Sequence, residues 1–559
     1  MPTPEEVQLF YQNIMSHIQK SYEESGVDII TADVQEEEIW ISMQDNVKLR
    51  AMLYKPAGCS KLPLILQRTC YPHNEPIYKA HARELAKRGY AFLFEFCRGT
   101  GGSEGIWEPN VYDRQDGRDT LDWLEKQDWV ECIGYWGESY LAFTGWILAD
   151  IVTPKVRSLC LANYGTDRYV SAYEKQLFRH DVLTSWAMGN AGYDILADYQ
   201  ESCKYRPHVL VDEALWGRKL EWYRKWITNT RKEDQYWQQG LWKQLEEIPT
   251  KVTIPVFLSE GWFDHHLGSA LHTWECLSEE AKEHSWFDIG PLNHFGQNSI
   301  NSYQPKNIHR EKCPPHLKWF ELTLKQKKLP ERTVNLYVIG EDQWKKTNEW
   351  PCPEIQKKIL YLGGDDKGQI VEEPGLENSI TYIYDPENPV PSRGAEAMLH
   401  TMSEIGSRLQ PKPGDRNDVL SFLSDALEKD LRIFGKTTVY LFASTDAEDT
   451  AFTAKLMEVL PNGEAYNIRS SITTIAADVE NYSPNSVIEV CINMWDIAWT
   501  IRKGSRLRLD ISSSDFPQYA IHSNYPGIWS CCEDTRKAKQ VICFGKSVPS
   551  RIELEILSE

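Results

Sequence analysis

A chain of 559 residues is longer than one hydrophobic core usually organises, so its length predicts more than one domain. The net charge of −20 argues against nucleic acid or an anionic membrane as a partner, because both are polyanions. No apolar run approaches the roughly 20 residues that span a bilayer, and the early Glu5 and Glu6 are not typical of a signal peptide. The 13 cysteines are scattered and form no C-x-x-C pair, so neither a zinc site nor a redox motif is predicted. These features favour the reducing cytoplasm.

The first part of the chain alternates strand-like and helical patterns. Residues 1–36 form an N-terminal extension in which an amphipathic helix is expected. A β-hairpin is then predicted at 38–54, around the turn Gln44-Asp45-Asn46. Short apolar runs with helical patterns between several of them follow at 62–70, 91–97, 132–136 and 156–163. This alternation predicts the first part of an α/β-hydrolase domain, at 37–164, with a mostly parallel sheet covered by helices.

The pattern changes twice further along. Residues 165–250 carry few strand signals and many aromatics, which predicts a helical cap inserted over the site. Most of its six tryptophans should pack the core of the cap, and one or two should face the substrate: Trp186, Trp216, Trp222, Trp226, Trp237 and Trp242. The α/β domain resumes at 251–328. Short alternating segments from 329 to 559, the first at 333–339, predict an all-β sandwich.

Ser139 lies in Gly-Glu-Ser-Tyr at 137–140, between an apolar run and the helical stretch 141–149. A glycine two residues before a serine, at a strand-to-helix turn, is the pattern of a nucleophile elbow. The second glycine of the usual motif is replaced by Leu141, and a helix-capping serine would fit the same letters. Because a serine alcohol is a poor nucleophile until a base takes its proton, the assignment depends on residues further along.

Asp264 and His294 follow Ser139 in the order Ser, Asp, His that α/β-hydrolases use. Each comes after a short apolar run with strand character. A carboxylate at a strand exit can hold an imidazole in one tautomer, and that imidazole can take the serine proton. His265 and His266 are rival bases, but they lie too close in sequence to Asp264 to reach across to the serine.

Four segments resemble the catalytic-domain motifs of the cocaine-esterase-like serine hydrolases, relatives of the X-Pro dipeptidyl peptidases and α-amino acid ester hydrolases. They are Phe-Cys-Arg-Gly-Thr-Gly-Gly-Ser-Glu-Gly at 96–105, Gly-Glu-Ser-Tyr-Leu at 137–141, Gly-Trp-Phe-Asp at 261–264 and Gly-Pro-Leu-Asn-His at 290–294. A fifth segment, 444–456, resembles the signature of the family's C-terminal β-domain. The resemblance runs from about residue 37 to the C-terminus, and it implies that the β-sandwich is a jelly roll.

An oxyanion hole completes the expected site, and no metal or organic cofactor is needed. One donor is the backbone N–H of Tyr140, the residue after the nucleophile. In the family that this chain resembles, the second donor is a tyrosine hydroxyl on the loop after an early strand, which is Tyr71 here; a tyrosine that only covers apolar surface is the alternative. Two departures from the family pattern, Ala142 for glycine and Phe96 for aspartate, concern packing. Arg98 is expected to tie loops together.

Three functions from different classes fit these residues. The leading one is hydrolysis of an ester or amide of a small acyl substrate through an acyl-enzyme intermediate. The second is release of X-Pro dipeptides, although the chain shows no extra N-terminal domain of the kind that many such enzymes carry. The third is a non-hydrolytic role, either acyl transfer in a biosynthetic pathway or binding on an inherited scaffold. A complete triad argues against pure binding. We expect a small-molecule partner and leave a homodimer open.

The residues after Asp264 bear on substrate choice. The α-amino acid ester hydrolases that this chain resembles place carboxylates near the catalytic acid to hold an ammonium group, whereas His-His-Leu-Gly follows here. Because an ammonium group buried without a partner is costly, we expect neutral acyl groups rather than free α-amino acid esters. Asp194 or Asp198 of the cap could supply the missing carboxylate.

Overall fold

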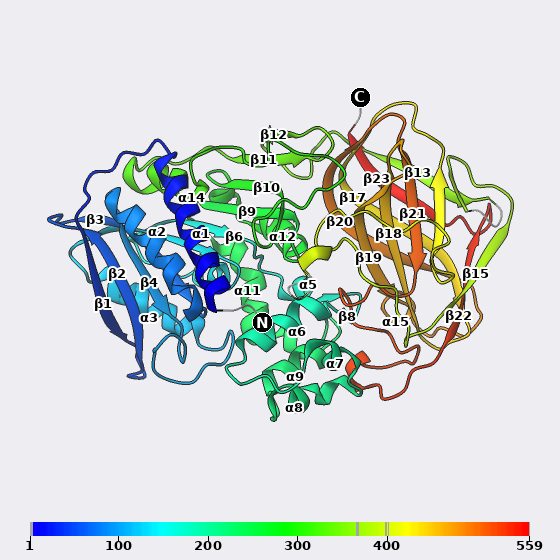
Figure 1. Ribbon diagram of the computed structural model, residues 1–559, viewed down its shortest axis with the longest axis horizontal. Helices are drawn as coiled ribbons and strands as arrows, with labels where there is room; N and C mark the ends of the chain where they lie inside the picture. The colour runs from blue at the N-terminus through cyan, green and yellow to red at the C-terminus, as the bar shows by residue number, and fades with distance from the viewer. Residues whose placement is uncertain (1–3, 365–367, 397, 399, 401, 558–559) are drawn as a thin grey trace.

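The computed structural model describes residues 4–364, 368–396, 398, 400 and 402–557. Figure 1 shows an α/β domain and a β-rich C-terminal domain lying side by side, with the cap helices below and between them. Helix α1 (Pro4–Glu23) packs against α2 (Glu75–Lys87), as the amphipathic pattern of the N-terminal extension predicts. Among the described residues, no helix is both long and apolar enough to span a bilayer.

The first sheet has ten strands in the order β1-β2-β4-β3-β5-β6-β9-β10-β11-β12. Neighbouring strands from β4 to β11 pair in parallel, while both edges are antiparallel. The strands are β1 Val34–Ser42, β2 Lys48–Pro56, β3 Leu62–Thr69, β4 Ala91–Phe96, β5 Val130–Glu138, β6 Val156–Ala162, β9 Val256–Phe263, β10 Trp286–Asn293, β11 Thr333–Val338 and β12 Gln343–Thr347. The carboxyl ends of β3, β5, β9 and β10 therefore meet at one edge, where open α/β sheets bind their ligands.

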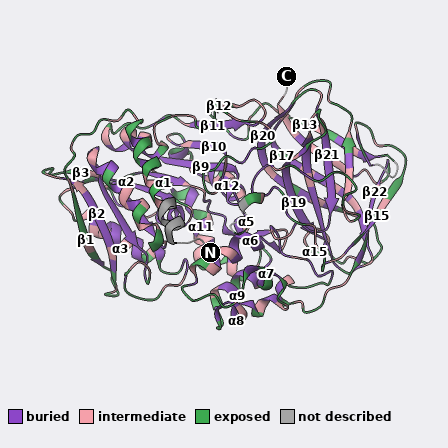
Figure 2. Ribbon diagram, viewed as in Figure 1, coloured by how far each residue is buried: buried purple, intermediate pink, exposed green. Residues whose placement is uncertain are grey.

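Helices cover both faces of this sheet, so its central strands are buried on both sides. Every residue of β4 is buried, as near-continuous apolar runs in parallel strands require. Figure 2 shows the buried strands in purple, while residues 11–23 of α1 are mostly exposed or half-buried. The remaining helices of this domain are α3 Asp113–Glu125, α4 Tyr140–Trp146, α12 Leu267–Cys276, α13 Glu279–Lys282 and α14 Pro315–Phe320.

A helical cap lies between β6 and β9 in the chain. Its helices are α5 Arg168–Ala172, α6 His180–Asn190, α7 Tyr199–Lys204, α8 Val211–Trp216, α9 Glu221–Thr228, α10 Gln235–Gln238 and α11 Gly240–Glu247. A short hairpin, β7 (Tyr173–Glu174) with β8 (Leu177–Phe178), was not predicted. The cap also contacts the C-terminal domain, because the backbone N–H of His180 donates to the carbonyl of Gln518.

Eleven strands form the sheet of the C-terminal domain, and their pairing is antiparallel except between β14 and β16. This agrees with the all-β prediction, while the jelly-roll topology stays a prediction. The strands are β13 Ile355–Gly363, β14 Gln369–Val371, β15 Asn378–Tyr384, β16 Leu420–Ser424, β17 Leu431–Thr445, β18 Ala451–Val459, β19 Ala465–Thr474, β20 Ile488–Ile501, β21 Arg506–Ser512, β22 Ala538–Phe544 and β23 Arg551–Leu557.

One local expectation was wrong. Residues 333–339 were assigned to the β-sandwich, but β11 pairs in parallel with β10 and extends the first sheet. The side chains of β11 are buried in the first sheet. An apolar pattern indicates that a strand is buried, but it does not indicate which of the two sheets the strand joins. Strands β9 and β10 end at Phe263 and Asn293, with an irregularity in β10 after Gly290, so Asp264 and His294 each directly follow a strand. The other domain boundaries stay predictions.

Candidate active site

Ser139 occupies a strained turn between β5 and α4. Its backbone has φ 56° and ψ −126°, a left-handed conformation that costs a non-glycine residue free energy and that clusters at functional sites. Gly137 is required beside it, since a Cβ there would lie 2.1 Å from the carbonyl oxygen of Leu141. The helix begins so close to the strand that only hydrogen fits at this position. This is the geometry that the elbow pattern predicts.

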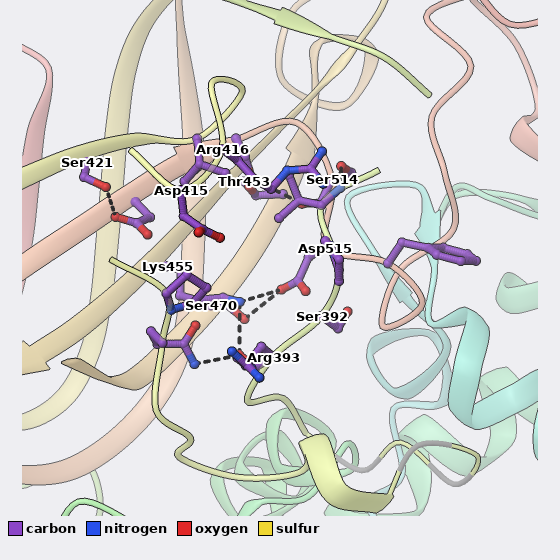
Figure 3. Close-up of a pocket in the computed structure, with 18 of the residues that line it drawn as sticks. Ser392, Arg393, Asp415, Arg416, Ser421, Thr453, Lys455, Ser470, Ser514 and Asp515 are labelled. Carbon is purple, nitrogen blue, oxygen red and sulfur yellow. Dashed lines mark hydrogen bonds and ion pairs between the residues drawn. The ribbon is translucent and has the colours of Figure 1, made fainter. Parts of the chain in front are cut away.

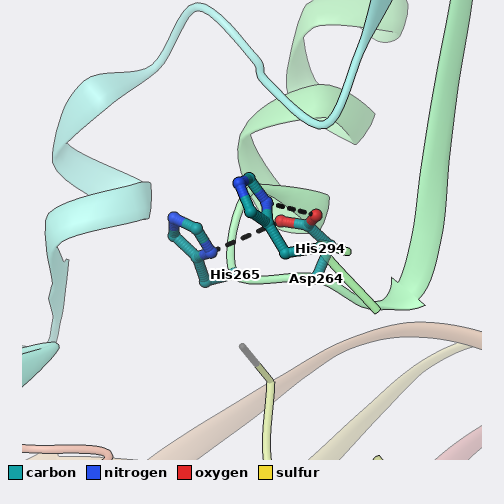
Figure 4. Close-up of side chains that lie close together, drawn as sticks. All are labelled: Asp264, His265 and His294. Carbon is teal, nitrogen blue, oxygen red and sulfur yellow. Dashed lines mark hydrogen bonds and ion pairs between the residues drawn. The ribbon is translucent and has the colours of Figure 1, made fainter. Parts of the chain in front are cut away.

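The structure brings the three predicted residues into one hydrogen-bonded chain. The Ser139 hydroxyl lies 2.9 Å from Nε2 of His294, and Nδ1 of His294 lies 2.7 Å from Oδ2 of Asp264. Figure 4 shows the second contact, with the two side chains directed toward each other. The three residues follow the carboxyl ends of β5, β9 and β10, so the topology of the sheet brings together positions 155 and 30 residues apart.

The electrostatics of the pair suit proton transfer from the serine. Burial alone would lower the pKa of His294, but the Asp264 carboxylate outweighs burial and the pKa ends raised. For Asp264, burial acts to raise the pKa, and the charges and hydrogen bonds of His294, His265 and the backbone hold it below its usual value. A charged Asp264 that fixes Nδ1–H of His294 leaves Nε2 free to accept the serine proton.

Tyr71 lies beside this chain of hydrogen bonds, on the loop after β3. Its hydroxyl accepts a hydrogen bond of 2.9 Å from the indole N–H of Trp186, and it also interacts with the side chain of Ser139. Burial raises the pKa of Tyr71 well above its usual value, so the hydroxyl keeps its proton at neutral pH. Because the hydroxyl oxygen accepts from Trp186, its own O–H can donate toward Ser139, where a substrate carbonyl oxygen would lie.

The other predicted donor, the backbone N–H of Tyr140, is held by a network below the elbow. As the first residue of α4, Tyr140 has an N–H of the kind that a helix leaves without an intrahelical acceptor. Its side-chain hydroxyl donates to Asp113 over 2.7 Å and accepts from the backbone N–H of Asn110 over 2.8 Å. These two bonds fix the side chain of the residue whose amide is the predicted backbone donor.

As expected, Arg98 ties loops together, and the two departures from the family pattern, Phe96 and Ala142, are packed in the interior. Arg98 makes two hydrogen bonds to Asp116 and one to Asp45, which ties the glycine-rich loop to α3 and to the first hairpin. Phe96 is fully buried, and a Cβ on Gly101 would lie 2.2 Å from its ring. Ala142 is also fully buried, so its methyl group is accommodated in α4.

Cap residues line one side of a pocket that contains Ser139. Two of the six cap tryptophans, Trp186 and Trp226, line it, as the sequence led us to expect. None of the described residues that line the pocket is a carboxylate, and Asp194 and Asp198 are exposed elsewhere on the cap. The sequence reasoning did not single out the lining residues Asn110, Tyr164, Arg168, Val182 and Leu183, because nothing in local sequence shows which cap residues face inward.

His265 and His266 lie in the same pocket, but neither contacts the Ser139 hydroxyl. Nδ1 of His265 lies 3.5 Å from Oδ1 of Asp264, a contact that Figure 4 marks with a dashed line. Nδ1 of His266 lies 2.8 Å from the Ser171 hydroxyl. Burial, reinforced by the neighbouring positive groups, lowers the pKa of both rings well below the usual value. Although Asp264, His265 and His294 could together reach one ion, both nitrogens of His294 are engaged by Ser139 and Asp264. The geometry therefore fits a base better than a metal site.

A larger cavity, of about 590 Å³, lies in the C-terminal domain. Figure 3 shows that charged groups of its wall pair with one another, as Lys455 does with Asp515 over 3.7 Å. Arg508 likewise pairs with Asp510 over 2.6 Å. The cavity contains neither Ser139 nor His294, so we place no acyl chemistry there.

The elbow, its hydrogen-bonded partners and the sheet around them define a serine hydrolase with an α/β-hydrolase-type domain followed by a β-rich domain. The family model of the X-Pro dipeptidyl-peptidase (S15 family) matches residues 45–296, and that of the X-Pro dipeptidyl-peptidase C-terminal non-catalytic domain matches residues 315–553.

Relatives of known name match over nearly the whole chain. Cocaine esterase of Rhodococcus sp. is 26% identical over 570 residues, which cover 93% of this chain and 98% of the esterase. Two solved structures share the fold, each with a TM-score of 0.78 over 95% of this chain. One is an aminopeptidase of a Thaumarchaeota archaeon, 21% identical and covered over 98% of its length, and the other an α-amino acid ester hydrolase, 20% identical and covered over 97%. The chain therefore belongs to the cocaine-esterase-like serine hydrolases.

Proposed function

We propose that this protein hydrolyses an ester or amide of a small acyl substrate, with Ser139 as nucleophile, His294 as base and Asp264 as orienting acid. The observation that carries the proposal is the continuous chain of hydrogen bonds from the Ser139 hydroxyl through His294 to Asp264, at a strained elbow beside a pocket lined by cap residues. The cocaine esterase relative supports the esterase class.

The reaction has two stages. Ser139 Oγ attacks the substrate carbonyl while Nε2 of His294 takes the hydroxyl proton, and the carbonyl oxygen becomes an oxyanion held by Tyr71 O–H and the Tyr140 N–H. His294 then delivers the proton to the leaving alcohol or amine, which leaves an acyl-enzyme ester. A water molecule gives its proton to His294 and attacks this ester, and the acid product leaves as Ser139 regains its proton.

The pocket favours an esterase or acylase over an X-Pro dipeptidyl peptidase. A dipeptidyl peptidase must hold the ammonium group of its substrate's N-terminus, and none of the described residues lining the pocket is a carboxylate. Acyl transfer to an alcohol or amine uses the same residues and differs only in which molecule attacks the acyl-enzyme. The thirteen cysteines, all free, support our proposal of a cytoplasmic protein.

Fluorophosphonate labelling of the wild type and of Ser139→Ala tests the proposal. We expect the wild type to be labelled and to hydrolyse short-chain esters, and the folded variant to lose both properties. The exposed Ser60 provides a matched control, because Ser60→Ala removes a hydroxyl far from the elbow. Wild-type turnover by a folded Ser139→Ala protein would refute the assignment of the nucleophile. A panel of esters, amides and X-Pro substrates would then rank the three functions.

A further inference from the structure

Arg168 is a charged side chain in the pocket that contains Ser139, and the proposed reaction gives it no role. It is the first residue of α5, only 8% exposed, and it lines the pocket together with Trp226 and His294. An arginine is always charged at physiological pH, and taking its guanidinium out of water is costly unless an anion compensates. The group that compensates the charge of Arg168 therefore indicates what the pocket binds.

No carboxylate within the described ranges forms an ion pair with Arg168. The acidic group nearest in sequence, Asp167, pairs instead with Lys232 over 2.7 Å and accepts the backbone N–H of Val170. Asp264, the acid of the hydrogen-bonded chain, is engaged by His294. Arg168 thus brings a positive charge into a pocket wall that offers no negative one among its described residues.

Aromatic groups hold the guanidinium in place. Its central carbon lies 5.1 Å from the ring centroid of Trp226 and 5.8 Å from that of Trp242, and the Tyr164 hydroxyl is a hydrogen-bonding neighbour. Contacts with ring faces stabilise the cation without using its N–H donors. A guanidinium has five such donors in a planar fork, so one tyrosine leaves donors for a ligand.

We propose that the acyl group of the substrate carries a carboxylate, as in a half-ester or half-amide of a small dicarboxylic acid, and that Arg168 binds this carboxylate. A planar guanidinium and a carboxylate can form two parallel charge-assisted hydrogen bonds, which also fixes the orientation of the acyl group. The inference rests on the proposed function, because the bond that breaks is still the ester or amide bond at Ser139. The distal carboxylate keeps its charge throughout and takes no part in bond making.

This inference replaces the expectation of a neutral acyl group. That expectation followed from the missing carboxylate after Asp264, which argues against an ammonium group and says nothing against an anion. The sequence reasoning did not consider Arg168, because an arginine at the start of a short cap helix carries no local sign that it faces the substrate.

The test compares two esters of nearly equal shape. Monomethyl glutarate carries the carboxylate, and in the methyl ester of isoheptanoic acid an isopropyl group replaces it. A hydrogen bond with charged partners predicts that the wild type prefers the glutarate ester in kcat/KM by about 10- to 100-fold. Arg168→Gln should lower this ratio by a similar factor, and Arg168→Lys should lower it less. Arg231→Gln is the matched control, because it removes the same charge from an exposed position of the cap and should leave the ratio unchanged.

The outcomes separate this inference from the proposed function. A wild type that hydrolyses both esters without preferring the anionic one would overturn the role of Arg168 and leave the hydrolase proposal intact. An equal loss on both esters in Arg168→Gln would also overturn it, because that is what a purely structural arginine would give. If Arg168→Gln does not fold, the wild-type preference decides. Absence of both turnover and fluorophosphonate labelling would refute the proposed function itself.

Discussion

Tyr71→Phe removes one hydroxyl from the candidate oxyanion hole and keeps the ring. Because the Tyr71 oxygen already accepts from Trp186, the proton of the hydroxyl is what the substrate oxyanion would lose. Removing one such donor typically lowers kcat by about 10²–10³, which corresponds to roughly 2.7–4 kcal/mol of transition-state stabilisation. KM should change little, since the ground-state carbonyl uses the donor less than the oxyanion does. The variant also leaves the Trp186 N–H without its acceptor, a loss of about 1 kcal/mol in the free energy of unfolding.

Steady-state kinetics with a short-chain ester and thermal unfolding of the same preparations separate the two effects. Tyr78→Phe is the matched control, since it deletes a buried hydroxyl that pairs with Thr69 outside the pocket, and its kcat should stay near that of the wild type. Trp186→Phe removes the donor to Tyr71 but keeps the Tyr71 hydroxyl, so its loss in kcat should be smaller. If Tyr71→Phe stays within about threefold of the wild type, a change far below the expected range, the tyrosine only covers apolar surface and the reasoning is refuted.

Three further predictions concern the base, the acid and the elbow. Because the pKa of His294 is raised, kcat/KM should fall at acidic pH with an apparent pKa above the usual histidine value of 6.5. Activity is lost as pH falls through that pKa, since protonated His294 cannot accept the serine proton. An apparent pKa below 6.5 on the acid side of the profile would contradict this. Asp264→Asn removes the charge that raises this pKa, so the acid side of the kcat/KM profile should move to lower pH while kcat falls by about 10⁴, as in other triads. If the profile does not shift, a group other than His294 controls it. Gly137→Ala places a methyl group 2.1 Å from the Leu141 carbonyl, and its Tm should fall, whereas Gly189→Ala, with open space around its Cβ, should leave Tm equal or higher; equal Tm values would show that the elbow relaxes.

Local sequence determined the parts of the site that depend on neighbours along the chain. These parts are the glycine two residues before Ser139 and the apolar runs that precede Asp264 and His294. The order of the three residues along the chain matches that of the α/β-hydrolases. The alternation of strands and helices indicated a parallel sheet, and in such a sheet all strand exits face one edge. The meeting of Ser139, His294 and Asp264 therefore followed from the fold class.

Only the tertiary structure decided which side chains of the cap face the substrate and which strands are neighbours. The apolar pattern of β11 shows that its residues are buried, but burial against β10 and burial in a sandwich produce the same pattern. Arg168 looks in sequence like any arginine at the start of a short helix, and its contacts with Trp226 and Trp242 come from segments roughly 60 and 70 residues away. Periodicity along a segment fixes whether a face is apolar. The packing of distant segments fixes what that face meets, and so Ser139 could be found from the sequence and Arg168 could not.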